Sequence, residues 1–381
     1  MILDLSDIKK RIIEFRHDLH RIPEIGFLVY KTNSYIRNVL APLDCDVSEI
    51  AKTGILANFD FGKKETLVFR ADMDALPIEE RTGLDFASEI PGCMHACGHD
   101  GHMAGLLGFA LLLNEYKKSG KSFNYNALLL FQPAEETIDG ALRICGTGIF
   151  DKYNVKGIFG LHLWPTLSKG EIASRPGAMM ARSTEVTVTF DGLSAHCATP
   201  EEGKDALEAA CKFVDTIYEF KSMRSSERSI IKFGHMVSGT VRNAISANTK
   251  LTGTMRTLNG ETWKILVDLM NNTASTISAI SGVNINVNIG KSHPPVINDE
   301  DLYRELKPTL LKLNYVEMRQ PVMIAEDFAF FERQIPGIFF FLGTGSGIPL
   351  HSDTYTFDDD VLIESVKLFD AIFKGLSDLD T

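Results

Sequence analysis

Continuous apolar segments in the first and last parts of the chain predict strands that are buried on both faces. Four short segments consist of apolar residues and glycine: 67–69, 127–131, 157–161 and 337–342. Such strands are typical of a sheet with helices on each side. Between them, Ile8, Ile12, Phe15 and Leu19 recur at helical spacing, and Ser6 is the expected N-cap of that helix. Residues 104–113 and 361–373 also read as helices.

The middle of the chain has a different pattern. Val186, Val188 and Phe190 alternate with threonines, and residues 283–289 alternate between apolar side chains and asparagine. Period-two alternation predicts strands with one solvent-exposed face, as in an antiparallel sheet. Helical stretches at 204–220 and 261–281 can cover the other face.

This change of pattern predicts two domains. The first is discontinuous, 1–180 and 293–381, an α/β unit with a mainly parallel sheet and helices on both faces. The second, 181–292, is a smaller inserted α+β domain with an antiparallel sheet. Turn-forming residues lie near both boundaries, Arg-Pro-Gly at 175–177 and His-Pro-Pro at 293–295.

Charge and composition exclude several partners. The 381 residues include 39 Lys and Arg against 50 Asp and Glu, a net charge of −11. This balance disfavours nucleic acid or an anionic membrane as a partner. The N-terminus shows no apolar signal-peptide core, and the apolar stretches fall short of the roughly 20 residues that span a bilayer. Six cysteines are too sparse for a disulfide scaffold, so we expect reduced thiols and a cytoplasmic location.

Polar side chains follow each of the four buried strands. Asp72 and Asp74 come after the first, Glu135 and Glu136 after the second, and His162 after the third. The fourth leads into a glycine-rich loop that ends at His351. Ligands of open α/β sheets bind at the carboxyl ends of the strands, so these groups are expected to converge on one edge.

The densest cluster is His-Ala-Cys-Gly-His-Asp-Gly-His at 95–102, ahead of the predicted 104–113 helix. Closely spaced cysteine and histidine suit a transition metal. The alternative is a polar loop with one buried thiol and Asp100 as a helix cap. Because Glu135 and Glu136 are adjacent, one can bind a metal while the other acts as a base; the alternative is a solvated acidic pair. Asp72 and Asp74 could be ligands, orienters of a ligating histidine, or loop carboxylates, and their spacing does not decide.

Seven motifs occur in an order that resembles the M20 metallopeptidase superfamily, in its amidohydrolase branch. They are RADMDALP (70–77), MHACGHDGH (94–102), FQPAEE (131–136), GLHLWP (160–165), GTMRT (253–257), EDFAF (326–330) and HS (351–352). That branch includes N-acyl-amino-acid amidohydrolases, hippurate hydrolase, indole-acetyl-amino-acid hydrolases and N-acetyldiaminopimelate deacetylases. MHACGHD is the most specific motif, because the wider superfamily has a metal-bridging aspartate where this branch uses a cysteine.

The resemblance implies a two-metal site and assigns roles to individual residues. Two divalent ions per subunit, Zn, Mn, Co or Ni, would be held by Cys97, His99, Glu136, His162 and His351. Glu135 would be the general base for the metal-activated water. The inserted domain would serve as dimerisation and lid domain. Its His196 would help hold the scissile carbonyl, often from the partner subunit, and Asn243 and Arg256 would lie near the substrate carboxylate.

The implied reaction is hydrolysis of a linear amide, an N-acyl amino acid, to a carboxylic acid and a free amino acid, by a homodimer joined through the inserted domain. Alternatives are a metallo-carboxypeptidase or dipeptidase on the same scaffold, a cysteine hydrolase using Cys97 and His99, and a non-catalytic binding protein. A cysteine hydrolase would leave four residues without a role: Glu135, Glu136, His162 and His351. Two segments depart from the family pattern, 137–140 and 244–247, and both bear on the substrate.

Overall fold

The computed structural model describes residues 4–137, 140–224 and 228–377, and the chain divides into two compact units. The larger comprises Met1–Met179, Ile297–Gln320 and Asp327–Thr381, and the smaller Met180–Val296 and Pro321–Glu326. The short segment 321–326 thus groups with the smaller unit, which the sequence did not indicate. The reason is local pairing, because Met180 forms a bridge with Val322 and the Ala181 N–H donates to the Ile324 carbonyl at 3.0 Å.

The larger unit is built on an eight-stranded sheet in the order β1-β2-β4-β3-β5-β14-β6-β13. Its central strands, β4, β3, β5 and β14, are parallel to one another. The strands are β1 (Asp46–Ile50), β2 (Gly54–Phe59), β3 (Thr66–Asp72), β4 (Asn126–Gln132), β5 (Val155–Trp164), β6 (Ile172–Ser174), β13 (Tyr315–Glu317) and β14 (Gly337–Gly343). A separate two-stranded sheet pairs β7 (Gly177–Met180) with β12 (Val296–Asn298).

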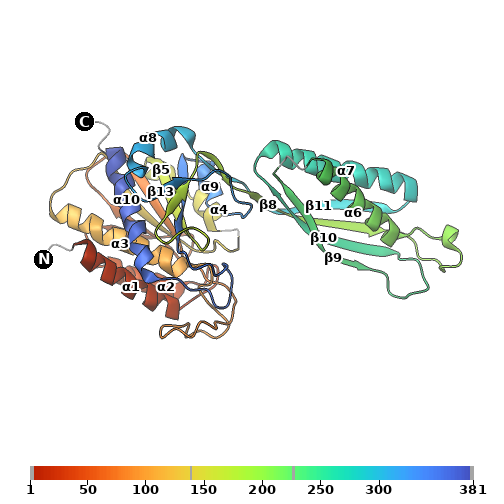
Figure 1. Ribbon diagram of the computed structural model, residues 1–381, viewed down its shortest axis with the longest axis horizontal. Coiled ribbons are helices and arrows are strands. Elements are labelled where there is room, and N and C mark those ends of the chain that lie inside the picture. The colour runs from red at the N-terminus through yellow and green to blue at the C-terminus, as the bar shows by residue number, and fades with distance from the viewer. Residues whose placement is uncertain (1–3, 138–139, 225–227, 378–381) are drawn as a thin grey trace. The chain divides into compact units, whose positions relative to one another are not determined.

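Helices cover both faces of this sheet. On one face α1 (Leu5–Arg21), α3 (His99–Lys118) and α10 (Leu362–Ser377) pack on one another and share a core with α2 (Tyr30–Leu40) and α8 (Glu300–Leu310) (Figure 1). The short helices α4 (Gly140–Cys145), α5 (Ile149–Lys152) and α9 (Ala329–Glu332) cover the other. Every residue of β3, β4 and β14 is buried, which explains the continuous apolar segments 67–69, 127–131 and 337–342 within them. Two 3₁₀ turns, Pro200–Glu202 and Asp359–Val361, complete the helical elements described.

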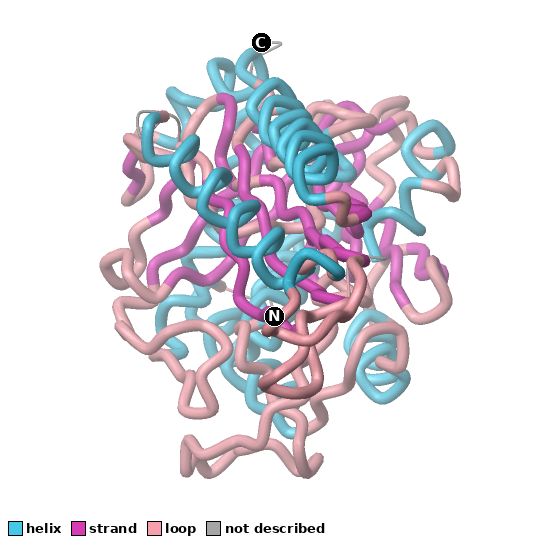
Figure 2. The backbone as a smooth tube through the Cα atoms, turned by 90° about the vertical axis from the view of Figure 1, so that its right-hand side faces the viewer, coloured by secondary structure: helices cyan, strands magenta, loops and turns pink. Residues whose placement is uncertain are grey.

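Two helices begin at residues other than those expected. Asp4 caps α1, accepting from the Ser6 and Asp7 N–H groups at 2.8 and 2.9 Å, so the prediction of Ser6 as N-cap is wrong. Helix α3 begins at His99, five residues before the predicted start, because Gly98 adopts a left-handed φ of 84° that turns the chain into the helix. The long segment between β3 and α3 has neither helix nor strand elements; such loops are pink in Figure 2. His99 and His102 therefore lie in the first turn of a helix rather than on that loop.

The smaller unit has a four-stranded antiparallel sheet in the order β11-β8-β10-β9. Its strands are β8 (Arg182–Asp191), β9 (Ile230–Ser238), β10 (Asn248–Thr257) and β11 (Asn284–His293). Helices α6 (Ala206–Met223) and α7 (Gly260–Ser281) cover one face, where Val186, Val188 and Phe190 are buried. The predicted fold class, an α/β unit with a smaller antiparallel α+β unit, is confirmed. Among the described residues, the helices are all too short or too polar to cross a bilayer.

A buried ionic contact joins α1 to the start of α3. Arg16 and His20 on α1 both bond Asp100, at 3.2 and 2.8 Å, and His20 lies 3.3 Å from Glu80. Burial alone would lower the pKa of His20, but the charge and hydrogen bond of Asp100, with a smaller contribution from Glu80, raise it to about 9. Burial likewise opposes ionisation of Asp100, yet His20 and Arg16 hold the pKa of that carboxyl far below its ordinary value.

This contact predicts a loss of stability at alkaline pH. Because the pKa of His20 is higher in the folded than in the unfolded chain, its contribution is fully present below pH 6.5 and is lost as the pH rises through about 9. The shift corresponds to at most about 3 kcal/mol. Urea unfolding between pH 6 and 10 measures it, with His20→Gln as the comparison. An equal decline in the free energy of unfolding of both proteins would contradict this role of His20.

Candidate active site

Five of the expected site residues lie at the carboxyl edge of the large sheet. Potential ligand atoms of Cys97, His99 and His162 lie within 4.8 Å of one another, and so do those of Cys97, Glu136 and His351. Cys97 belongs to both groups. Such a set of donors, two imidazoles on one side of the thiol and an imidazole and a carboxylate on the other, would suit divalent transition-metal ions, with the Cys97 sulfur available to both groups.

His99 and His162 both turn the same ring nitrogen, Nε2, towards the other donor atoms of the cluster. The Nδ1 atoms of His99 and His162 each lie 2.7 Å from a backbone carbonyl, that of Asp74 and that of Leu163 respectively. Each Nδ1 therefore carries the proton, and each Nε2 presents its lone pair to the cluster. The Nε2 of His162 lies 3.3 Å from the Cys97 sulfur. Fixing the tautomer through the second ring nitrogen is the usual arrangement around metal-binding histidines.

Asp74 holds the two glutamates. Its carboxylate accepts from the backbone N–H groups of Glu135 and Glu136, at 2.9 and 3.3 Å, and it is completely buried. The residue before them, Ala134, has a φ of 61°, a left-handed conformation that turns the chain sharply at the end of β4. Of the three roles left open for Asp74, the geometry favours an orienting one, because its oxygens are taken up by these backbone donors.

The sequence assigned no role to His102, yet both of its ring nitrogens are hydrogen-bonded. Its Nδ1 lies 2.6 Å from Asp72, and its Nε2 accepts the backbone N–H of Leu163 at 2.9 Å. Asp72 also accepts from Arg70 at 2.9 Å. Asp72 thus bonds a histidine and an arginine. The available signal was the three-residue spacing from His99, which places both rings on one face of a helix.

His351 differs from the other potential ligands in exposure and backbone conformation. Its side chain is 51% exposed, and its Nε2 lies 3.3 Å from a carboxylate oxygen of Glu136. Its φ of 63° is left-handed, which is uncommon outside glycine, and its N–H donates to the Ala96 carbonyl at 2.9 Å. Such backbone conformations concentrate at functional sites. His351 therefore faces Glu136 from the solvent side of the cluster.

The protonation of this cluster differs from residue to residue. Burial, with the charges of Glu136 and Glu135, raises the pKa of the Cys97 thiol well above its ordinary value. Burial lowers the pKa of His162, which is neutral at pH 7. Burial raises the pKa of Glu136, but the hydrogen bond to His351 and the electrostatic effect of His99 and His351 outweigh it, so the pKa is lower than its ordinary value. Of these three potential ligands, Cys97 is therefore the one that would have to lose a proton to bind metal.

Metal binding should accordingly release a proton from Cys97. Calorimetric titration of the metal-free protein in buffers of different ionisation enthalpy counts the released protons. Cys97→Asp, which keeps an anionic bridging group with a low pKa, should release about one proton fewer than the wild type. Because release by other groups is common to both proteins, equal proton counts would contradict a thiolate ligand at Cys97.

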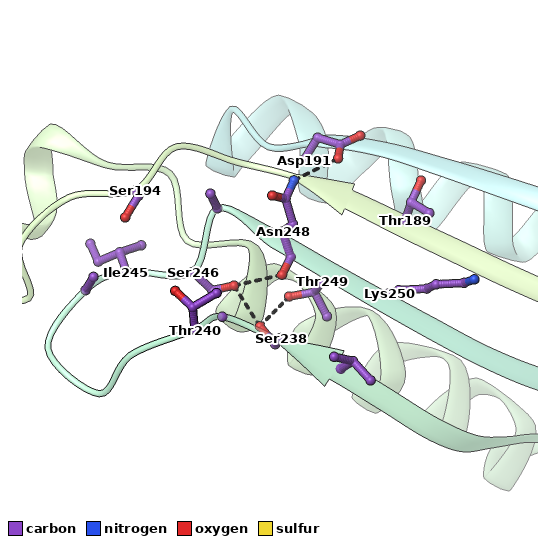
Figure 3. Close-up of a pocket in the computed structure, with 14 residues that line it drawn as sticks. Thr189, Asp191, Ser194, Ser238, Thr240, Ile245, Ser246, Asn248, Thr249 and Lys250 are labelled. Carbon is purple, nitrogen blue, oxygen red and sulfur yellow. Dashed lines mark hydrogen bonds between the residues drawn. The ribbon is translucent and has the colours of Figure 1, made fainter.

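The three expected residues of the smaller unit do not all lie together. His196 forms a bridge with Ala244, and the Cys197 N–H donates to the Asn243 carbonyl at 3.1 Å, so His196 and Asn243 lie on adjacent loops. Arg256 lies near the other end of β10, and the strand between Asn248 and Arg256 is about 26 Å long. The loop after Asn243 also borders a pocket of about 570 Å³ (Figure 3). There Ser238 bonds Ser246 and Thr249 at 2.8 and 2.6 Å.

Of the two segments that depart from the family pattern, only one is fully described. Residues 138 and 139 lie outside the described residues, whereas Thr137 and Gly140 are within them. In the 244–247 segment, the Ile245 N–H donates to the Ala195 carbonyl at 2.9 Å, next to His196. This segment therefore fixes the backbone beside His196.

A buried cluster of thiol, imidazole and carboxylate donors beside a glutamate pair, at the carboxyl edge of an α/β sheet, defines a metal-dependent hydrolase. The chain belongs to peptidase family M20/M25/M40, whose family model matches residues 68–375. The expected resemblance is thereby confirmed, and with it a hydrolase of amide or peptide bonds.

Relatives and solved structures extend over nearly the whole chain. An uncharacterized hydrolase of Staphylococcus epidermidis is 33% identical over 376 residues, covering 96% of this chain and 97% of that relative. A crystal structure from methicillin-resistant Staphylococcus aureus matches with a TM-score of 0.90 and 29% identity, covering 97% of each chain. The Bacillus subtilis YXEP protein, described as a dinuclear metal binding peptidase from the M20 family, matches with a TM-score of 0.86 and 28% identity, covering 98% of this chain and 99% of that one.

Proposed function

We propose that this protein is an amidohydrolase that cleaves N-acyl amino acids, such as N-acetyl amino acids, to a carboxylic acid and a free amino acid. The observation that carries the proposal is the sharing of Cys97 by two donor groups next to the Glu135–Glu136 pair. In the family resemblance described above, a cysteine at this position distinguishes the amidohydrolase branch from members with a bridging aspartate.

Two divalent ions, Zn, Mn, Co or Ni, would be held by Cys97, His99, Glu136, His162 and His351. When bound, they polarise the amide carbonyl and lower the pKa of water towards neutrality. Thiolate and imidazole donors favour Zn or Co, and imidazoles with a carboxylate also suit Mn or Ni.

Glu135 is proposed as the proton-transfer group. It lies beside Glu136, and its backbone is fixed through Asp74 at 2.9 Å, so its carboxylate is attached to an ordered turn. It takes a proton from the attacking water and delivers it to the leaving amine, the double role of one well-placed carboxylate. His196 would donate to the oxygen that becomes negatively charged in the transition state. Asn243 and Arg256 would bind the substrate carboxylate.

We further propose a homodimer in which the partner subunit supplies His196 and Asn243. Within the smaller unit, Arg256 pairs with Ser183, close to Met180 where the chain enters that unit. His196 follows β8 and therefore lies at the opposite end of the sheet. Strand β9 is an edge strand, with Met236 and Val237 partly exposed, and it offers its backbone to an edge strand of a second copy.

A metallo-carboxypeptidase or dipeptidase is the second candidate, because the Bacillus subtilis neighbour is described as a peptidase. The two functions differ in whether the acyl group is itself an amino acid. We propose a small-molecule substrate, a cytoplasmic location and neither nucleic acid nor membrane as partner, consistent with the net charge of −11.

The proposal is tested with an activity panel. Metal-free enzyme reconstituted with Zn, Mn, Co or Ni is assayed on N-acetyl and N-benzoyl amino acids beside dipeptides with the same C-terminal residue. Higher kcat/KM on the N-acyl amino acids supports the amidohydrolase. Higher kcat/KM on the dipeptides identifies the second candidate, and failure to cleave either class would contradict both.

A further inference from the structure

The end of β5 that carries His162 lacks a strand partner on one side. Strand β3 pairs with β5 only as far as Arg70 and Gly160, whereas β14 continues to Trp164 on the other side. Beyond Gly160, the Leu163 N–H donates to the Nε2 of His102 at 2.9 Å. The imidazole of His102 thus takes the place of the missing strand.

His102 is itself held from behind by a buried chain of charged groups. Because its Nε2 accepts a hydrogen bond, its proton is on Nδ1, which donates to Asp72 at 2.6 Å. The other oxygen of Asp72 accepts from Arg70 at 2.9 Å, and Arg70 also donates to Asp327 at 3.0 Å and to Gln132 at 2.8 Å. All five side chains are at most 2% exposed. Breaking such a buried network is costly, so the ring of His102 is fixed in place.

The residue that His102 holds also sets the orientation of His162. The Nδ1–H of His162 donates to the Leu163 carbonyl at 2.7 Å, and Leu163 is the residue whose N–H bonds His102. The direction of the His162 lone pair therefore depends on the Leu163 backbone. Both ring nitrogens of His102 are engaged, which suits a supporting role rather than ligation, although its ring lies near His99 and Asp72.

We infer that His102 is a positioning residue for the metal ligand His162, acting through the backbone of Leu163 and anchored by Asp72 and Arg70. This inference rests on the proposed two-metal site. It concerns the ion of the Cys97, His99 and His162 group. The second group shares Cys97 with the first, but its other members, Glu136 and His351, are not part of this chain of contacts, so we expect its ion to be weakened much less.

The test measures metal affinity directly. Metal-free protein is titrated with Co²⁺ by calorimetry, in the wild type and in His102→Leu. Loss of an orienting partner typically weakens metal binding 10- to 100-fold, and we expect that loss for one ion of the two. In a Glu136→Gln background, which should retain only the ion of the His162 group, the same fold-change should appear in a single-site isotherm.

Two further variants separate positioning from general destabilisation. His102→Gln should recover part of the affinity, because its amide can both accept from Leu163 and donate to Asp72. His20→Gln removes another buried imidazole that bonds a carboxylate near the start of α3 but has no link to Leu163. It should lower the thermal midpoint and leave both affinities at the wild-type value.

Wild-type affinities for both ions in His102→Leu would overturn the inference. Equal weakening of both ions, matched by His20→Gln, would also overturn it, because it would show a structural role only. If His102→Leu does not fold, Asp72→Asn carries the test with the same expected asymmetry, and His102→Gln should again show the smaller loss. A wild-type protein that binds fewer than two ions would contradict the proposed site itself and is recognised separately, before any variant is compared.

Discussion

Glu135→Gln should lose most of its turnover while it keeps both metal ions. A neutral amide cannot accept the proton of the attacking water, and loss of a general base typically costs about 10²- to 10⁴-fold in rate. The turn that carries both glutamates should be kept, because the bond to Asp74 comes from the backbone N–H of Glu135, which the substitution retains. Turnover with saturating substrate and metal content by atomic spectroscopy are measured on the same sample.

Glu136→Gln is the matched control, because it makes the same change one residue along the chain. Its side chain lies with Cys97 and His351 in one donor group, so this variant should lose metal occupancy as well as activity. An excess of metal should restore part of the activity of Glu136→Gln and none of that of Glu135→Gln. If Glu135→Gln instead loses its ions, the roles assigned to the two glutamates are wrong.

Hybrid dimers of His196→Ala and Glu135→Gln should recover activity that neither homodimer has. If His196 acts on the partner's site, each hybrid has one site with both lesions and one intact site, so purified hybrid should show about half of the wild-type activity. A statistical mixture, half of it hybrid, should show about a quarter. Co-expression with two different affinity tags and sequential purification isolates the hybrid.

The control for this experiment is a doubly tagged dimer in which both chains carry Glu135→Gln, which should remain inactive. Inactive hybrids of confirmed composition would show that His196 acts within its own subunit or has no part in catalysis. A monomer at assay concentration would contradict the dimer proposal before any hybrid is made.

The parts of the fold set by burial were predictable from the sequence. A strand covered on both faces is mostly apolar, so the centres of β3 and β4 and nearly all of β14 were visible as continuous apolar segments. The strands of the smaller unit were visible by alternation for the corresponding reason. The cap of α1 was missed because Asp4 and Ser6 can both accept from free N–H groups, and helix ends are the least determined positions.

The residue types of the site could be predicted from the sequence, but the hydrogen bonds between them could not. Cys97 and His99 are neighbours in sequence, so their cluster was evident. The roles of Asp72, Asp74 and His102 depend on which strand ends lie side by side and which ring nitrogen faces which carbonyl, and spacing carries neither. The motif order likewise gave no indication that the length of β10 separates Arg256 from Asn243.

The most direct test of the account is a titration of activity with metal. The chelated enzyme is supplied with increasing amounts of Mn²⁺ or Zn²⁺, and the release of free amino acid from an N-acetyl amino acid is followed beside the number of ions bound per chain. The account predicts that the chelated enzyme is inactive and that hydrolysis reaches its maximum when about two ions are bound per chain. Full activity in the chelated enzyme, or two bound ions without hydrolysis of any N-acyl amino acid in the panel, would contradict it.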